Sequence, residues 1–256
     1  MTKDRLIGAQ WFTDFGKPSP GLTHMLCLAG AGAFATEFYQ WPQALRGHAD
    51  VAAVLLPGRE RRIREPGIRV MSELVDALVS SIRPWLGQPL ALFGHSFGAL
   101  VMFELARRLH REEAKGNLRH LFVSGQLAPR IRQQVPSSSS TDQELIAYIR
   151  SFNGAPEDVL ANRAFMQSYF PGMRADLALY ESYQFLPGEL VDCPVTAYFG
   201  TNDDSVSAED VRTWQEVATG PIASVGIPGG HLFMRTHISD LVTDIASRLE
   251  ADAHAR

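Results

Sequence analysis

The sequence predicts an α/β fold in which a mainly parallel central sheet is flanked by helices. Short runs of apolar residues bounded by Gly or Pro alternate along the chain with segments that have helical periodicity. Runs that are apolar throughout are typical of strands buried on both faces, as in a parallel sheet whose helical connections cover both sides. The length of 256 residues, of which 45% are hydrophobic, suffices for one large core of this kind.

Six apolar runs are expected to form the strands. The first, residues 23–28, ends in the small-residue turn Ala29-Gly30-Ala31-Gly32, and the second, residues 51–56, is stopped by Pro57-Gly58. The other four runs are residues 89–93, 121–124, 194–199 and 222–227. Each is short and bounded, as buried strands usually are.

Helices are expected between and after these runs. Apolar residues recur at helical spacing within residues 72–85, 97–109 and 238–249, which gives each segment one apolar face. Two pairs, Ser207 with Asp210 and Thr141 with Glu144, have the spacing of a capping box at the start of a helix.

The alternation of strand and helix breaks between about residues 126 and 191. This stretch contains a run of four serines at 137–140, expected to be a flexible connection, followed by segments with helical patterns. We therefore expect one domain spanning residues 1–256. Its core would comprise about residues 20–125 and 192–252, with residues 126–191 inserted as a helical lid.

Composition and charge exclude several classes of function. The formal net charge of −4 gives no electrostatic footprint for nucleic acid. Residues 1–17 lack the apolar core of a signal peptide, and no apolar run is long enough to span a membrane. Cys27 and Cys193 both lie in apolar runs, which favours reduced thiols. We expect a soluble, cytoplasmic protein with no metal or nucleotide motif and no cofactor.

Gly94-His95-Ser96-Phe97-Gly98 has the Gly-x-Ser-x-Gly pattern of a nucleophile elbow. It follows an expected strand directly and precedes a segment with clear helical periodicity, which is the context that the α/β-hydrolase fold requires. The tight turn between strand and helix holds the serine in a strained backbone conformation and leaves no room for side chains at the two glycines. Ser96 is therefore the expected nucleophile.

The general base and the acid that orients it should follow Ser96 in the order acid, then histidine. His231 comes just after the last expected strand, and the other histidines precede that strand, fall in the final helix or tail, or adjoin the serine. His95, the adjoining one, is expected to point elsewhere. For the acid, the Gly-x-x-Asp-x-x-Val spacing from Gly200 favours Asp203, with Asp204 as the alternative.

An oxyanion hole needs two backbone N–H donors. One is expected from Phe97, immediately after the nucleophile, and the other from the loop at residues 30–33 after the first strand. A side chain does not supply the donor, so the role tolerates substitution.

Four arginines, Arg59, Arg61, Arg62 and Arg64, form a basic cluster after the second strand. Such a run is usually a solvated loop, and that is the expectation here. Contact with an acidic partner is the alternative.

Beyond these features, the chain resembles the type II thioesterases that accompany polyketide and nonribosomal peptide synthetases. The resemblance covers nearly the whole chain, and its most telling block is Leu56-Pro57-Gly58-Arg59-Glu60 followed by Arg62. The other matching segments are residues 27–33, Trp41, residues 92–99, Ser124-Gly125, Ala128-Pro129, Arg174-Ala175-Asp176, Trp214 and residues 229–233.

The resemblance implies a serine hydrolase that removes acyl groups from the phosphopantetheine arm of an acyl or peptidyl carrier protein. It makes Ala31 the second oxyanion donor, and it makes the insertion a lid whose apolar face, including Leu177 and Tyr180, lines the acyl cavity. A monomer is the expected state. The chain departs from the family pattern in two places: it has Ala29-Gly30-Ala31-Gly32-Ala33 where the family usually has Pro-His-Ala-Gly-Gly, and Phe97 where the family usually has Met.

Two other functions remain open on the sequence alone. One is a carboxylesterase or lipase that acts on free esters, which would use the same three catalytic residues. The other is a hydrolase fold that has lost catalysis and serves as a binding protein, although the retained triad speaks against it.

Overall fold

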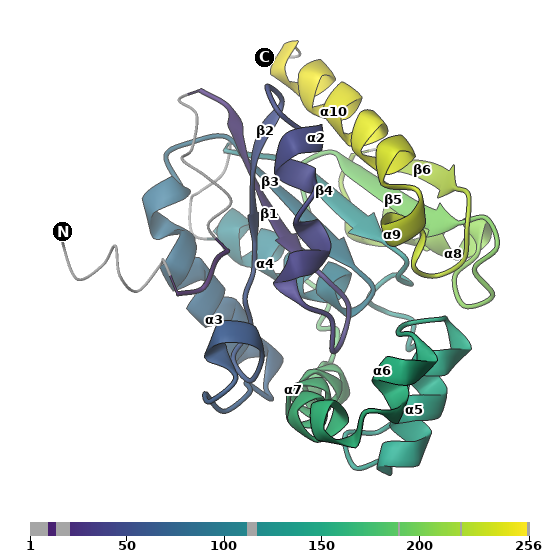
Figure 1. Ribbon diagram of the computed structural model, residues 1–256. Helices are drawn as coiled ribbons and strands as arrows, with labels where there is room; N and C mark the ends of the chain where they lie inside the picture. Colours follow the sequence, from purple (N-terminus) through teal and green to yellow (C-terminus); the bar gives the residue numbers. More distant parts are fainter. Residues whose placement is uncertain (1–9, 14–20, 112–116, 189, 221, 255–256) are drawn as a thin grey trace.

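The computed structural model describes residues 10–13, 21–111, 117–188, 190–220 and 222–254. Within these residues six strands form one sheet in the order β2-β1-β3-β4-β5-β6, and every neighbouring pair is parallel (Figure 1). The strands are β1 (Thr23–Leu28), β2 (Ala49–Ala53), β3 (Leu90–His95), β4 (Leu118–Ser124), β5 (Val195–Gly200) and β6 (Ile222–Ile227). The expected α/β fold is confirmed.

Strand β2 is displaced from the predicted run at residues 51–56. It begins at Ala49 and ends at Ala53. Beyond that point Val54 forms an antiparallel bridge with Phe12, and the Leu55 N–H donates to the Trp11 carbonyl at 2.8 Å. The Val54 N–H still donates to the Cys27 carbonyl of β1 at 2.8 Å, so the chain at this end of β2 contacts both β1 and residues 11 and 12.

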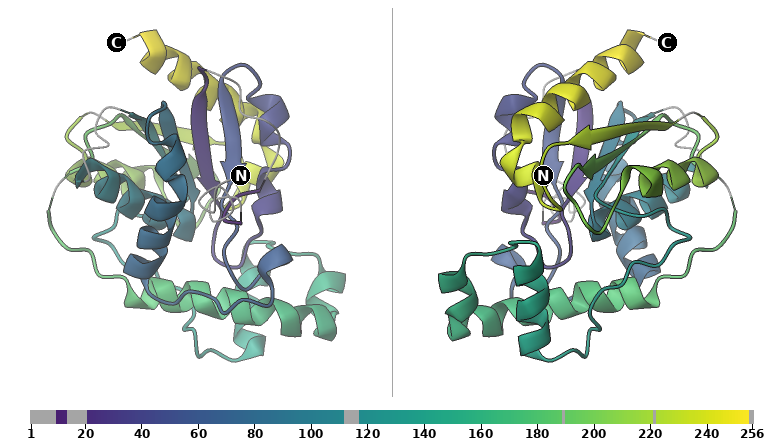
Figure 2. Two further views of the ribbon diagram at one scale, coloured as in Figure 1. Left: turned by 90° about the vertical axis from the view of Figure 1, so that its left-hand side faces the viewer. Right: turned by 90° about the vertical axis from the view of Figure 1, so that its right-hand side faces the viewer.

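Helices cover both faces of the sheet (Figure 2). Leu26 and Leu28 of β1 pack into a cluster with α3 (Met71–Ile82) and α4 (Phe97–Arg111), whereas Met25 and Cys27 pack into a second cluster with α10 (Ile238–His254). This alternation follows from the two-residue period of a strand. The remaining helices on the core are α2 (Trp41–Ala44), α8 (Ala208–Arg212), α9 (Phe233–Thr236) and the short 3-10 helices η1 (Ala35–Phe38), η2 (Glu60–Arg62), η3 (Arg83–Trp85) and η4 (Thr213–Val217).

Three helices, α5 (Asp142–Ser151), α6 (Glu157–Ala161) and α7 (Arg163–Ser182), lie between β4 and β5 in the chain and gather at one end of the sheet (Figures 1 and 2). They share a cluster of buried side chains of their own, among them Leu145, Ile149 and Met173. Helix α5 begins with the predicted capping box, in which Thr141 accepts from the Glu144 N–H. The predicted box of Ser207 and Asp210 likewise begins α8.

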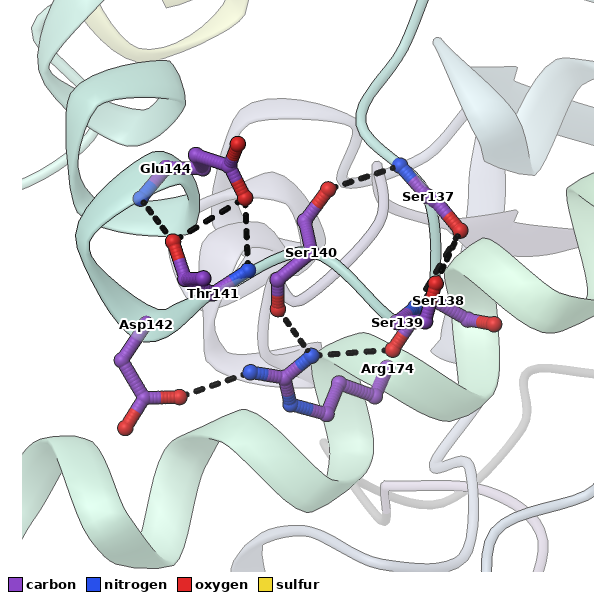
Figure 3. Close-up of polar contacts among 8 residues, drawn as sticks. All are labelled: Ser137, Ser138, Ser139, Ser140, Thr141, Asp142, Glu144 and Arg174. Carbon is purple, nitrogen blue, oxygen red and sulfur yellow. Dashed lines mark hydrogen bonds and ion pairs between the residues drawn. The ribbon is translucent and has the colours of Figure 1, made fainter.

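The serine run, expected to be a flexible connection, is held by charged side chains of α7. The Arg174 guanidinium donates to the carbonyls of Ser138, at 2.9 Å, and Ser140, and it pairs with Asp142 at 2.7 Å (Figure 3). Glu181 accepts from both the N–H and the hydroxyl of Ser138 at 2.7 Å. A low-complexity segment is thus fixed because polar groups from α7 satisfy its backbone.

No helix in the described part of the chain is long and apolar enough to cross a membrane. Cys27 and Cys193 are both buried and unpaired. Residues 1–9 and 14–17, which belong to the segment expected to lack a signal peptide, lie outside the described residues.

Candidate active site

Ser96 lies at the turn from β3 into α4, and its backbone has the left-handed conformation expected of an elbow, with φ at +52°. The two flanking glycines explain why the turn can be so tight. A Cβ on Gly94 would overlap the backbone of Gly98 and Ala99, and a Cβ on Gly98 would overlap the Leu28 carbonyl of β1. Strain of this kind persists only where the surrounding structure enforces it, as at sites that present a reactive group.

The sheet order places this turn at a topological switch point. Strand β1 lies between β2 and β3, so the chain leaves β1 and β3 toward opposite edges of the sheet. In open α/β sheets, ligands bind at the carboxyl ends of the strands where the order reverses in this way. The loop after β1 and the turn at Ser96 both lie there.

His231 and Asp203 form a hydrogen-bonded pair after β6 and β5. His231 Nδ1 lies 2.8 Å from Asp203 Oδ2, and Asp203 Oδ1 accepts from the N–H and the hydroxyl of Ser205 at 2.8 and 2.6 Å. Burial raises the pKa of the Asp203 carboxyl, but the hydrogen bonds from His231 and Ser205 outweigh it and hold that pKa below its ordinary value. Asp203 is therefore an anion that accepts a hydrogen bond from the Nδ1–H of His231. This contact favours the tautomer protonated at Nδ1 and leaves Nε2 for proton transfer.

Asp203, rather than its neighbour Asp204, is the carboxylate that meets His231. Its side chain is 2% exposed, whereas Asp204 is an exposed residue of the same loop. Of the two carboxylates that the sequence left open, Asp203 is the one that turns inward onto Ser205 and His231.

Ser96 and His231 line the same cavity, of about 60 Å³, together with the loop after β1. Gly30 in that loop comes so close that a Cβ on it would lie 3.4 Å from Ser96 Cβ. Within the described residues, the N–H groups of Ala31 and Phe97 donate to no other protein group. The two donors expected for an oxyanion hole are thus free beside the serine.

A buried ion pair that the sequence did not reveal fixes the loop after β1. Asp176 of α7 accepts from the Gly32 N–H at 2.8 Å through Oδ2, and its Oδ1 lies 2.6 Å from Arg59 Nη2. Arg59 also donates to the carbonyls of Ala33, at 2.9 Å, and Gly172, at 3.3 Å. Helix α7 is thereby tied to the loop that carries Ala31.

The arginine cluster is therefore only partly the solvated loop that its composition suggested, since Arg61 and Arg64 are exposed but the other two are buried. Arg59 and Arg62 are each 5% exposed. Arg62 pairs with Glu65, donates to the Leu55 carbonyl at 2.9 Å and lies 4.3 Å from the centre of the Trp11 ring. Long arginine stems bury readily when their guanidinium groups find acceptors, and both groups do here.

His95 is closer to the site than expected. Its ring lines the cavity, with its centre 5.1 Å from that of His231, while its Nδ1 lies 2.9 Å from Ser124 Oγ. Burial, reinforced by the neighbouring His231, lowers the pKa of His95 well below its ordinary value, so the ring is neutral. The neutral His95 ring therefore packs beside His231 and adds no charge to the cavity.

Leu177 and Tyr180, expected to line the acyl cavity, do not line it. Leu177 is 1% exposed and packs inside the cluster of α5 and α7, and the Tyr180 hydroxyl binds the backbone of Gln133. Leu177 belongs to the cluster of buried side chains within the insertion, and Tyr180 belongs to the core cluster that includes α3 and α4. The side chains that α5–α7 and the segment after α5 contribute to the cavity are Tyr148, Ile149, Phe152 and Tyr169.

Helical periodicity identified the apolar residues of these helices but did not indicate which of them face the serine. Among the described residues, no group of three or more His, Cys, Asp or Glu side chains is placed to hold a metal ion. Glu37 and Arg235, which form an ion pair at 2.7 Å, also line the catalytic cavity.

Comparison with known proteins agrees with this geometry. The family model for the thioesterase domain matches residues 23–252. The gramicidin S biosynthesis protein GrsT of Aneurinibacillus migulanus is 34% identical over 230 residues, covering 88% of each chain.

Two solved structures resemble the fold closely. The type II thioesterase BorB from the borrelidin biosynthetic cluster is 33% identical with a TM-score of 0.85, covering 93% of this chain and 97% of BorB. The RedJ thioesterase from the prodiginine pathway of Streptomyces coelicolor is 31% identical with a TM-score of 0.84, covering 92% of this chain and 90% of RedJ. The chain therefore belongs to the thioesterase domain family and is a thioester hydrolase, as its resemblance to the type II thioesterases predicted.

Proposed function

We propose that this thioesterase hydrolyses acyl groups from the phosphopantetheine arm of carrier proteins, an editing role in polyketide or nonribosomal peptide biosynthesis. The observation that carries the proposal is the convergence of Ser96 with the His231–Asp203 pair on one cavity. The printed names of its relatives, which include a gramicidin S biosynthesis protein and a type II thioesterase of a borrelidin cluster, supply the biosynthetic setting.

In the first step, Ser96 Oγ attacks the thioester carbonyl carbon while His231 Nε2 takes the hydroxyl proton. The C–O bond forms and the carbonyl electron pair moves onto the oxygen. When that oxyanion collapses, the C–S bond breaks, and the imidazolium returns its proton to the departing pantetheine thiolate. Asp203 stabilises the imidazolium and stays ionised throughout.

In the second step, a water molecule takes the place of the serine as the nucleophile. His231 removes a proton from a water molecule as its oxygen attacks the acyl-enzyme carbonyl, and the proton is then returned to Ser96 Oγ as the ester bond breaks. The products are a free carboxylic acid and the restored serine. Both steps pass through an oxyanion.

The N–H groups of Ala31 and Phe97 are proposed to bind that oxyanion in both steps. Loss of one such donor costs on the order of 3 kcal/mol in the activation barrier. Helix α4 begins at Phe97, so its positive dipole end adds to the stabilisation. Because both donors are backbone groups, the departures from the family pattern in the loop around Ala31 and at Phe97 leave the chemistry in place.

The helical insertion, about residues 126–191, is proposed to act as a lid on the single domain. Helices α5 and α7 supply one wall of the catalytic cavity, and this wall must shift to admit a pantetheine arm. The carrier protein would dock at this end of the sheet, where the strands end at Ser96.

Mass spectrometry of an acyl-loaded carrier protein mixed with the enzyme tests the proposal. The wild type is expected to discharge the acyl group, and Ser96→Ala is expected to leave it in place. Discharge by Ser96→Ala at the wild-type rate would show that the assignment of the nucleophile is wrong.

A matched oxygen ester and a fluorophosphonate probe separate the other functions. Faster turnover of the oxygen ester than of the carrier thioester would favour an esterase. Failure of the probe to label Ser96 would favour a binding protein.

A further inference from the structure

A second, larger cavity of about 220 Å³ lies next to the catalytic one, between α7 and two loops of the core. Phe34 comes from the loop after β1, Ile63 follows η2, and Phe165 and Met173 come from α7, so its walls are mostly apolar. Arg59 and Glu60 also line it, but Arg59 pairs with Asp176 and Glu60 accepts from the Ala35 N–H at 3.0 Å. Ser168 lies at its exposed rim. None of the proposed catalytic groups lines this cavity.

Tyr169 lines both cavities. Its ring centre lies 6.0 Å from those of Phe34 and Phe165, edge-on to the first and stacked on the second. Its hydroxyl fits against Gly32, where a Cβ would overlap it. Burial raises the pKa of Tyr169 to about 12, so the side chain stays a neutral phenol at physiological pH.

The catalytic cavity is small on its own, at about 60 Å³ against about 220 Å³ beyond the tyrosine. We infer that Tyr169 is the residue that limits the length of the acyl group, because it closes the catalytic cavity off from the apolar cavity beside it. The enzyme therefore favours acyl groups of a few carbons. This inference rests on the proposed function and names the substrate class of the same site.

The chemistry of the walls decides which part of a substrate the second cavity would take if it were opened. The pantetheine arm carries two amides, a hydroxyl and a phosphate, which would lose hydrogen bonds to water among Phe34, Ile63 and Met173. Acyl methylenes lose none. Each methylene buried is worth about a fourfold gain in kcat/KM, the factor equivalent to about 0.8 kcal/mol.

Four variants test the inference on acyl-N-acetylcysteamine thioesters of two, four, six and eight carbons. Tyr169→Ala removes the dividing ring, and Tyr169→Phe keeps the ring as its matched control. Ser168→Trp fills the apolar cavity from the rim without touching a catalytic group, and the double variant combines Tyr169→Ala with Ser168→Trp. The ratio of kcat/KM for the octanoyl and acetyl thioesters is measured for each.

Tyr169→Ala is expected to raise that ratio at least tenfold, because several methylenes gain an apolar subsite. Tyr169→Phe and Ser168→Trp are expected to keep the wild-type ratio. The double variant is expected to lose most of the gain, because tryptophan occupies the opened space. Restoration of the ratio in the double variant would assign the gain to this cavity rather than to a general loosening of the lid.

A wild-type ratio in Tyr169→Ala, with the acetyl rate intact, would overturn the inference alone. A lower octanoyl rate in Ser168→Trp than in the wild type would also overturn it, because the chain would then already enter the cavity past the ring. Absence of hydrolysis at every chain length, in the wild type and the variants alike, would overturn the proposed function together with it.

Discussion

The Gly32 N–H donates a hydrogen bond of 2.8 Å to Asp176 Oδ2, which joins the loop beside the serine to a helix 144 residues later in the chain. Gly32 follows Ala31, so the carboxylate that holds Gly32 also fixes the position of the proposed oxyanion donor. Arg59 completes the arrangement by pairing with the other oxygen of the same carboxylate at 2.6 Å.

Asp176→Ala should lower both stability and turnover. Removing one partner of a buried ion pair costs about 3 to 5 kcal/mol in the free energy of unfolding, because the other charge is left unpaired. If Asp176 also positions Ala31, kcat falls while KM stays nearly unchanged. Denaturant unfolding and steady-state kinetics at low temperature measure the two effects.

Asp252→Ala is the control for Asp176→Ala. It breaks a second largely buried pair, with His120 at 2.7 Å, whose residues do not line the catalytic cavity. This variant should lose stability and keep its kcat when folded. Equal kcat in folded Asp176→Ala and wild type would contradict the positioning role.

Asp203→Asn should reduce kcat by on the order of 10⁴, because an amide at this position favours the wrong tautomer of His231 and cannot stabilise the imidazolium. Asp204→Asn is the matched control, one residue away in the same loop. It should retain nearly full activity, since no contact joins Asp204 to His231 in the described structure. The opposite ranking in a thioesterase assay would exchange the two assignments.

The ionisation of Asp203 predicts how stability depends on pH. In the unfolded chain this carboxyl titrates near its reference pKa of about 3.9, and in the folded protein its pKa is lower. The stabilisation is therefore fully present above the unfolded pKa and is lost as pH falls through the folded pKa. Between about pH 5 and pH 2, the wild type should lose more stability than Asp203→Asn, which has no carboxyl to protonate. Thermal unfolding midpoints across this range provide the measurement, and a constant difference between the two proteins would contradict it.

Arg174→Ala should release the serine run. The guanidinium binds two carbonyls of residues 137–140 and pairs with Asp142 (Figure 3), so its loss exposes an unsupported backbone segment. Limited proteolysis should then cut within or near the run. Arg150→Ala, which removes the exposed ion pair with Glu157, should leave the cleavage pattern unchanged. Resistance of both variants to cleavage would show that other contacts hold the run.

The sequence by itself determined the parallel α/β fold, the position of the elbow at Ser96 and the order in which the acid and histidine follow. These features are local. A strand is recognised by its continuous apolar run and a capping box by its three-residue spacing. The elbow is recognised by two glycines at positions where the turn has no room for a side chain. For the same reason, the boundaries of β2 were missed, because just beyond Ala53 the backbone pairs with the distant residues Trp11 and Phe12.

Only the tertiary structure decided the relationships that depend on which way a side chain turns. Asp203 differs from Asp204 in that it contacts a histidine 28 residues later in the chain. Arg59 pairs with Asp176, which lies 117 residues later. Arg174 and Asp176 lie two positions apart in α7 and so on nearly opposite sides of it, which sends one to the serine run and the other to the loop of Ala31. The apolar pattern of α7 likewise could not place Tyr169, rather than Leu177, at the cavity. Periodicity fixes which face of a helix is buried, whereas the partner that buries each residue is set by packing between segments far apart in the chain.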